Sequence, residues 1–286
     1  MLRGAFYTPA LMRSSTLARH VPALLAAVFF LLPLWFMISG SLRPVGLPPP
    51  QGVELLPRQP MLDSFVRLPQ LIPLWTYLRN SLIVTAIAVP LTVLVAAWAG
   101  FGIRLLSTRG RRRAVVASLV ILMVPTTALW TTRFEVYRLV GAIDTFVPLI
   151  APALAATTPF FVLIYAWSFS GVRDSQLEAA RLEGVSAWAL WRRIAMPQAK
   201  TATLAVAVLA FAFHWANFID ALLYVQSQNL FTAPLGMRFL HLLNPTDWPL
   251  LMAGSVVLTL PAVGVFLFAQ RLFLDDPLRG LRGGRS

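Results

Sequence analysis

Six long apolar segments constrain the fold of this 286-residue chain more than any other feature. They cover residues 21–41, 78–103, 114–132, 146–169, 201–225 and 250–272. About 20 apolar residues cross the roughly 30 Å hydrocarbon core of a bilayer. Lipid offers backbone groups no hydrogen-bond partner, so each segment must be a helix or a strand of a closed barrel. The lengths and the absence of two-residue alternation favour helices. The sequence therefore predicts an all-α polytopic membrane helix bundle with six transmembrane helices.

Prolines inside these segments also favour helices over strands. A proline removes one backbone donor, which a membrane helix tolerates with the help of its neighbours and a central strand does not. The prolines concerned include Pro33, Pro90, Pro125, Pro159 and Pro261. We expect them to act as tolerated kinks.

The composition argues against the soluble classes of protein. Hydrophobic residues make up 58% of the chain and charged residues only 12%, whereas a soluble globular chain carries about 25% charged residues. A single aqueous core of this size could not bury so much apolar surface. A soluble enzyme, a disordered tail and a nucleic-acid-binding domain are therefore disfavoured. The absence of cysteine excludes disulfides and thiolate metal sites.

The net charge of +13 reflects topology more than nucleic-acid binding. The N-terminal tail, the loop at residues 104–113, the loop at residues 171–200 and the C-terminal tail together hold 17 of the 24 basic residues. The other 7 lie on the opposite side of the predicted spans. Because cytoplasmic loops carry the excess of Lys and Arg, the sequence predicts that both termini and these two loops are cytoplasmic.

The predicted spans divide the chain into five regions. These are a cytoplasmic tail (1–20), a first transmembrane helix (21–41), an external loop (42–77), a core transmembrane domain (78–272, with the 171–200 loop) and a cytoplasmic tail (273–286). The proline-rich external loop is expected to be extended or turn-rich, and residues 226–249 form a second external loop. The first apolar segment could also be a secretory signal, but its length and weak cleavage match favour an uncleaved span.

The 171–200 loop contains the strongest motif. Residues 175–183 are good helix formers, and Gly184 can end that helix in a left-handed conformation. Ser186 is placed to cap a second helix with apolar residues at helical spacing, and Pro197 separates that helix from the next span. The sequence predicts two short helices joined by a sharp corner. Taken alone, the pattern also fits an interfacial helix anchored by tryptophans and arginines.

The spacing in this loop resembles the EAA loop of ABC-transporter permease subunits. The family pattern is Glu-Ala-Ala, three residues, Gly, and about nine residues later Ile-x-x-Pro. It is matched by Glu178-Ala179-Ala180, Gly184 and Ile194-x-x-Pro197. The surrounding sequence is similar to the sugar-transporter branch, in particular the smaller maltose-permease-like subunit. Supporting matches are Asn80-Ser81, Pro125, Thr158-Pro159-Phe160, Trp215 with Asn217, Met252-Ala253-Gly254-Ser255 and Gln270-Arg271. Departures are Glu183 in place of the usual Asp, and Ser175-Gln176-Leu177 in place of Pro-x-Glu-Leu.

The resemblance implies a mechanical role for the loop. In such permeases its first helix docks in a groove of a cytoplasmic ATPase and moves with it as a rigid lever. The ATPase-coupling residues would be Glu178, Ala179, Ala180 and Gly184. The implied partners are a second permease subunit, two copies of a cytoplasmic ABC ATPase and an extracytoplasmic sugar-binding protein, in the inner or plasma membrane of a prokaryotic cell.

The chain itself is not expected to bind a cofactor or to hydrolyse ATP. A P-loop needs a lysine after a glycine-rich run, and the only lysine, Lys200, follows Pro197-Gln198-Ala199. ATP and Mg would be used by the partner ATPase. The sequence contains no recognisable metal cluster, nucleophilic triad or carboxylate pair.

Polar residues inside the spans are candidates for the substrate pathway, because ionisable groups are costly at membrane depth. His214, Asn217 and Asp220 share one drifting stripe of the fifth predicted span, about 120° wide. They either face the pathway and hydrogen-bond a polar solute, or pair with one another or with the second permease subunit. Thr126 and Tyr165 are weaker candidates, since Thr often bonds its own helix backbone.

Three hypotheses of different classes follow from the sequence. The leading one is a permease subunit that forms half of an ABC importer pathway for a sugar, a di- or oligosaccharide, with glycerol phosphate as the nearest non-sugar solute. A gradient-driven secondary carrier is disfavoured, because Asp220 is the only acid well inside a span and no internal repeat is evident. A membrane-embedded enzyme is disfavoured, because His214 and Asp220 lack a recognisable catalytic companion.

Overall fold

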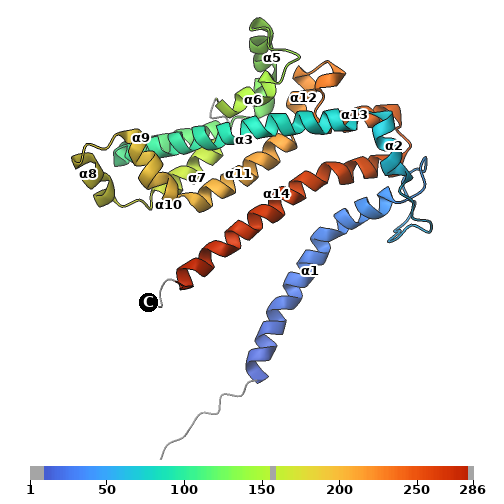
Figure 1. The fold of residues 1–286 in the computed structure, drawn as a ribbon, viewed down its shortest axis with the longest axis horizontal. Helices are drawn as coiled ribbons and strands as arrows, with labels where there is room; N and C mark the ends of the chain where they lie inside the picture. Colours follow the sequence, from blue (N-terminus) through green and yellow to red (C-terminus); the bar gives the residue numbers. More distant parts are fainter. Residues whose placement is uncertain (1–9, 155–158, 283–286) are drawn as a thin grey trace, which may run out of the picture. The chain divides into compact units, whose positions relative to one another are not determined.

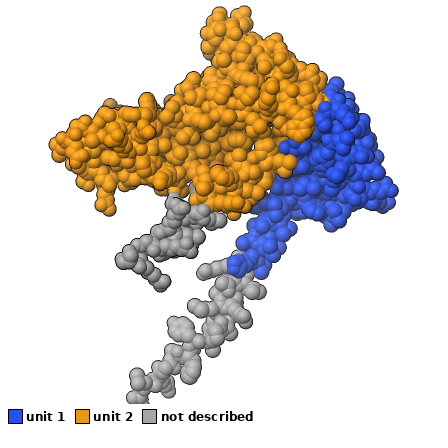
Figure 2. Space-filling view, viewed as in Figure 1, with its two compact units in different colours: residues 1–71, 240–257 blue, residues 72–239, 258–286 orange. Residues whose placement is uncertain are grey.

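The computed structural model describes residues 10–154 and 159–282, and the side chains of residues 20–154 and 159–272. All the regular elements in these ranges are helices, which confirms the all-α prediction. The chain forms two compact units, residues 1–71 with 240–257 and residues 72–239 with 258–286 (Figure 2).

Four helical segments are long and apolar enough to cross a membrane. They belong to α1 (Ala10–Ser41), α3 (Leu74–Leu105), α6 with α7 (Val147–Leu154 and Pro159–Phe169) and α14 (Trp248–Arg282). Two more candidates are bent pairs, α4 (Thr108–Leu122) with the segment Thr126–Leu139 at 82°, and Ala187–Gln198 with α11 (Lys200–Trp215) at 85°. The described residues therefore contain four candidate spans, or up to six if each bent pair is one span. The chain is a multi-pass membrane protein.

The predicted third span is not one continuous helix. Residues 114–132 are interrupted after α4, because Pro125 disfavours helical backbone for the residue before it and has no N–H to donate. A short 3-10 turn, η1 (Thr126–Leu129), and α5 (Trp130–Leu139) follow. Pro125 therefore ends a helix, whereas α1, α3 and α14 continue through Pro33, Pro90 and Pro261.

The predicted fifth span is interrupted as well. α11 ends at Trp215 and α12 (Ile219–Tyr224) begins after a short break. In the break, the Asn217 side-chain oxygen accepts a hydrogen bond from the Asp220 N–H at 3.2 Å. An Asn side chain that bonds nearby backbone in this way competes with helix continuation. The expectation that His214, Asn217 and Asp220 lie along one helical stripe is therefore wrong.

The first unit combines α1 with the segments at residues 42–71 and 240–257. Residues 42–62 are turn-rich, as predicted, but a short helix, α2 (Asp63–Leu71), follows and was not predicted. The Trp248 N–H donates to the Leu47 oxygen at 3.0 Å, and Arg67 forms an ion pair with Asp247 at 3.8 Å. Most apolar side chains of α1 from residue 21 to residue 38 are exposed within this chain, as expected of a surface that lipid or another subunit covers.

The core of the second unit is built around α3. This helix packs most extensively against α7, α11 and α6, and α7 and α11 lie alongside it in Figure 1. At Gly100, α3 and α7 approach closely, since a Cβ added there would lie 2.6 Å from the Cβ of Tyr165 and 2.9 Å from the Ala166 nitrogen. The remaining short elements of this unit include η3 (Gln228–Leu230) and residues 233–239 of α13 (Ala233–Leu243). A small residue at a helix crossing, such as Gly100 between α3 and α7, lets membrane helices approach closely.

We expect Gly100→Ala to destabilise the protein by about 1–3 kcal/mol, because backbone atoms of α7 would have to move. Gly102→Ala is the matched control on the same helix. A Cβ at Gly102 meets nothing within 4 Å, so alanine should be neutral or stabilising by about 0.5–1 kcal/mol. The thermal unfolding midpoint of the purified protein in detergent measures both. Equal midpoints for the two variants would contradict close α3–α7 packing.

Candidate functional site

The corner of the 171–200 loop is formed by Gly184. Its φ of +72° lies in the left-handed region that favours glycine. The Gly184 N–H donates to the Arg181 oxygen at 3.0 Å, and the Val185 N–H donates to the Ala180 oxygen at 3.0 Å. These two bonds are the Schellman pattern of helix termination. The first helix, α8 (Asp174–Leu182), therefore ends at a sharp corner, as predicted.

The second helix of the loop begins at the predicted cap. The Ser186 hydroxyl oxygen accepts a hydrogen bond from the Ala189 N–H at 3.3 Å. The helix then runs through α9 (Ala187–Leu190), a π-helical turn η2 (Trp191–Ala195) and α10 (Met196–Gln198). Pro197 has no N–H for the carbonyl four residues earlier, which accounts for the wider turn before it. The break before α11 comes at Ala199, two residues beyond the predicted position.

A buried arginine fixes the start of the loop. Arg104, at the end of α3, is only 7% exposed. Its Nε donates to the Phe169 oxygen at 3.1 Å, and its Nη2 donates to the Val172 oxygen at 2.8 Å and to the Asp174 carboxylate. One side chain thus joins the end of α3, the end of α7 and the first residue of α8.

The same contact controls the ionisation of Asp174. The hydrogen bond from Arg104 and its charge lower the pKa of this carboxyl below its usual range. A lowered pKa in the folded state means that the link is fully present above the unfolded pKa and is lost as pH falls through the folded pKa. The Asp174 side chain is 78% exposed, so we assign the pair to positioning α8 and not to global stability.

Three tryptophans attach the second helix of the loop to α3. The rings of Trp188 and Trp191 stack with centroids 4.9 Å apart. Trp98 of α3 meets both rings edge-on, at 5.4 Å and 5.8 Å. Aromatic pairs of this geometry contribute about 0.5–1.5 kcal/mol beyond the area they bury. Together with Phe101 and neighbouring residues, the three rings line an apolar cavity of about 220 Å³.

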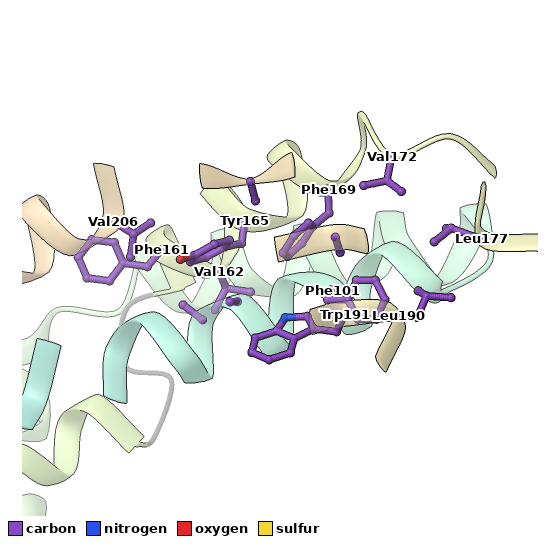
Figure 3. Close-up of a cluster of buried hydrophobic side chains, with 14 of the residues drawn as sticks. Phe101, Phe161, Val162, Tyr165, Phe169, Val172, Leu177, Leu190, Trp191 and Val206 are labelled. Carbon is purple, nitrogen blue, oxygen red and sulfur yellow. The ribbon is translucent and has the colours of Figure 1, made fainter. Parts of the chain in front are cut away.

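The loop and the membrane helices share one hydrophobic core. Leu177 of α8 and Leu190 and Trp191 of the second helix lie in the same buried cluster as Phe101 of α3 and Phe169 of α7 (Figure 3). A displacement of the loop must therefore repack side chains of α3 and α7, because closely packed cores transmit strain.

The two faces of α8 have different environments. Leu177 and Ala180 are buried in this core, whereas Glu178 and Ala179 are exposed and Leu182 is 90% exposed. Of the two alanines assigned to ATPase contact, only Ala179 is on the open face, and Ala180 packs within the chain. The open face offers a carboxylate, a small residue and a projecting leucine side by side.

Glu178 also borders a polar groove of about 240 Å³. Arg104, Arg111, Asp174 and Arg181 line the same groove. Among the described residues, Glu178 forms no ion pair within 4.0 Å. Its carboxylate is therefore available to a partner.

The candidate pathway residue His214 is buried against α3. Its Nε2 lies 3.1 Å from the hydroxyl of Thr92, which donates its own proton to the Ala88 oxygen at 2.8 Å. With its proton on the Ala88 oxygen, the hydroxyl accepts from His214 in the tautomer that carries its proton on Nε2. Nδ1 is left as a buried acceptor without a hydrogen bond among the described residues. His214 thus links α11 to α3.

Asn217 and Asp220 belong to a separate network. Arg133 of α5 contacts both carboxylate oxygens of Asp220 at 3.2 Å, and the Asn217 amide donates to the same carboxylate at 3.1 Å. The guanidinium also lies over the rings of Tyr137 and Tyr224, at 5.9 Å and 5.5 Å. The network joins α5 to α12, the two segments that follow the helix breaks.

The two weaker pathway candidates lie in opposite environments. Tyr165 is fully buried, and its ring stacks on Phe169 with centroids 5.6 Å apart. Thr126 is exposed within the 3-10 turn after Pro125. The candidate residues thus occupy several places and do not form one site.

Comparison with known families connects this architecture to a protein class. Residues 92–274 match the family described as "Binding-protein-dependent transport system inner membrane component". The match covers more than half of the chain and includes the whole 171–200 loop. The chain belongs to this family.

Curated relatives of this permease align over most of its length. It is 28% identical over 251 residues to the arabinooligosaccharides transport system permease protein AraQ of Halalkalibacterium halodurans, covering 87% of this chain and 89% of that protein. It is 25% identical over 245 residues to the trehalose transport system permease protein SugB of Mycobacterium tuberculosis, covering 85% and 89%. These relatives are permease subunits of ABC transporters, which are transport components without enzymatic activity.

A solved structure with the same fold is a bacterial ABC transporter involved in the import of the acidic polysaccharide alginate. The TM-score is 0.64 at 19% sequence identity, and the alignment covers 94% of this chain and 100% of that chain.

Three residues of the permease that position the loop or the helix breaks were not predicted. Arg104 and Arg133 were counted only as topological charges, and Trp98 only as part of a span. For Arg104 the available signal was an arginine in the last turn of an apolar segment, where a charge needs a partner. Nothing local to Trp98 or Arg133 points to partners 90 or 87 residues away.

Proposed function

We propose that this chain forms half of the translocation pathway of an ATP-driven importer and couples to a separate ATPase through α8 and the Gly184 corner. The observation that carries the proposal is the rigid attachment of an exposed helical face to the membrane helices. The corner fixes the end of α8, Arg104 fixes its start, and Leu177 anchors its middle. A stiff element of this kind can convert closure of a partner into rearrangement of the spans.

The open face of α8 supports docking into a groove of the ATPase. Ala179 allows close approach, Glu178 supplies a carboxylate that is free to pair with a basic residue, and Leu182 projects an apolar side chain. Apolar anchors with an adjacent charge are typical of tight protein contacts. Ala180 acts from the other side, by holding the helix against the permease core.

A sugar is the proposed solute, with a di- or oligosaccharide favoured. The names of the relatives, which concern arabinooligosaccharides and trehalose, support this class. Glycerol phosphate is the nearest alternative. His214 and Asp220 are both engaged within the chain, which favours the structural alternative for these two residues over sugar contact.

The proposed assembly contains a second permease subunit, two copies of the ATPase and an extracytoplasmic sugar-binding protein. A related alginate transporter was solved with a periplasmic protein that carries an alginate pentasaccharide. ATP and Mg would be bound by the ATPase, and this chain binds no cofactor in the proposed mechanism. The proposed location is the inner or plasma membrane of a prokaryotic cell, with the 171–200 loop in the cytoplasm.

Affinity purification in mild detergent tests the assembly. The tagged permease should retain a sibling permease and an ATPase, and Glu178→Arg should release the ATPase while keeping the sibling. Glu183→Arg, an equal charge change in the same loop, should retain more ATPase than Glu178→Arg. Purification without any ATPase, in detergents that preserve the sibling pair, would overturn the proposal and favour a gradient-driven carrier.

A further inference from the structure

A group of arginines at the start of α4 has no role in the coupling described above. Arg109, Arg112 and Arg113 are exposed. No acidic residue occurs anywhere in residues 64–134. Within the part of the chain that the structure describes, none of the three arginines has an ion-pair partner. Three positive charges are therefore left uncompensated on one helix end.

The structure fixes the direction in which these arginines point. The Ser107 hydroxyl caps α4 by accepting from the Gly110 N–H at 3.3 Å. Arg111, in the middle of the run, turns inward and donates from Nη2 to the Arg104 oxygen at 3.3 Å. These two contacts fix the orientation of α4 about its own axis. The three remaining arginines line an open groove of about 480 Å³, whose other lining residues are Val116 and Ala117.

The same helix face becomes apolar within one turn. Arg109, Arg113, Val116 and Val120 are spaced by four, three and four residues, which places them on one stripe of a helix. Val116 is 51% exposed and Val120 is 57% exposed. At 1.5 Å per residue, the stripe extends about 10 Å from Arg113 to Val120. The order along the stripe is cationic and then aliphatic.

We propose that this face binds an anionic phospholipid. Arg109, Arg112 and Arg113 hold the phosphate-bearing headgroup, and an acyl chain lies along Val116 and Val120. Guanidinium groups bind phosphate oxygens through paired, charge-assisted hydrogen bonds. An acidic protein surface would satisfy the arginines but not the exposed valines beside them. The proposal requires membrane insertion of α4 and does not depend on ATPase coupling.

Native mass spectrometry of the purified full chain, titrated with phosphatidylglycerol or phosphatidylcholine, measures this binding. Each basic residue near an anionic membrane surface contributes about 1 kcal/mol, or roughly a factor of five. The triple variant Arg109→Gln, Arg112→Gln, Arg113→Gln should therefore lose phosphatidylglycerol affinity on the order of 100-fold. Phosphatidylcholine binding should change little.

A second triple variant, Arg173→Gln, Arg192→Gln, Arg193→Gln, is the charge-matched control, because these arginines are also exposed and belong to the other basic loop. It should keep phosphatidylglycerol affinity within about threefold of the parent chain. Equal losses in both triple variants, or equal binding of the two lipids by the parent, would overturn the proposal. Displacement of the lipid by millimolar glycerol phosphate would assign the site to a free phosphate ester and overturn the lipid assignment. Retention of lipid by the first triple variant, together with its loss of the ATPase in the affinity purification described above, would assign the face to a protein partner and overturn the lipid assignment.

Discussion

Gly184→Pro should uncouple transport from ATP hydrolysis in the reconstituted importer. Proline holds φ near −65° and has no N–H, whereas Gly184 has a φ of +72° and donates to the Arg181 oxygen. The substitution removes the corner that sets the angle between the two helices of the 171–200 loop. Transport should fall on the order of tenfold or more, the loss expected when a coupling free energy of 1–3 kcal/mol disappears. ATP hydrolysis by the partner should continue.

Gly141→Pro is a closely matched control for this experiment. Gly141 has a φ of +67°, and its N–H donates to the Arg138 oxygen at 3.1 Å, also three residues earlier. Neither glycine has an atom within 4 Å of an added Cβ. The two variants therefore impose the same backbone penalty at sites predicted to lie on opposite sides of the membrane. Similar transport losses per ATP hydrolysed would contradict a specific role for the Gly184 corner.

Asp220→Ala should produce the largest loss of stability among the polar substitutions in this chain. It leaves the Arg133 guanidinium, which is 25% exposed as a side chain, without its bidentate partner. Removing one partner of a fully buried ion pair costs about 3–5 kcal/mol, and partial exposure reduces this to about 2–3 kcal/mol. The thermal midpoint in detergent should fall by about 4–12 °C. Asp220→Asn, which retains a side-chain acceptor, should have an intermediate midpoint.

An exposed ion pair on α5, the helix that carries Arg133, provides the comparison. Arg138 and Glu135 of α5 are 62% and 50% exposed as side chains, so Glu135→Ala should cost less than about 0.5 kcal/mol. The double variant Arg133→Ala, Asp220→Ala should be less destabilised than the sum of the single variants, because no unpaired charge remains. An additive double variant, or equal effects of Asp220→Ala and Glu135→Ala, would show that the network does not hold α5 to α12.

The sequence predicted the 171–200 loop well because its structure depends on local chemistry. Gly184 supplies a positive φ and Ser186 supplies a cap, and each acts within a few residues. The all-α class followed equally directly from segment length and from the need to satisfy the backbone in lipid. Whether each span is one continuous helix could not be predicted in the same way. Pro90 and Pro125 look alike in the sequence, but only Pro125 ends a helix.

The contacts that hold the site together could not be predicted from the sequence, because they join residues that are far apart along the chain. Arg104 reaches Asp174, 70 residues away, and Trp98 reaches Trp188 across the core. Such partners are selected by the packing of α3 against α7 and by the fold of the loop, not by neighbouring residues. The candidate pathway residues illustrate the same limit: His214 and Asp220 are six positions apart, yet they belong to separate networks because the helix breaks between them.

Uptake of radiolabelled oligosaccharide into proteoliposomes that contain the complete assembly tests the coupling mechanism most directly. ATP supplied on the side of the ATPase should drive uptake in the presence of ionophores that collapse all ion gradients, and Glu178→Arg should abolish that uptake. Uptake that follows a proton or sodium gradient without ATP, or that is unchanged by Glu178→Arg, would contradict ATP-driven import through α8.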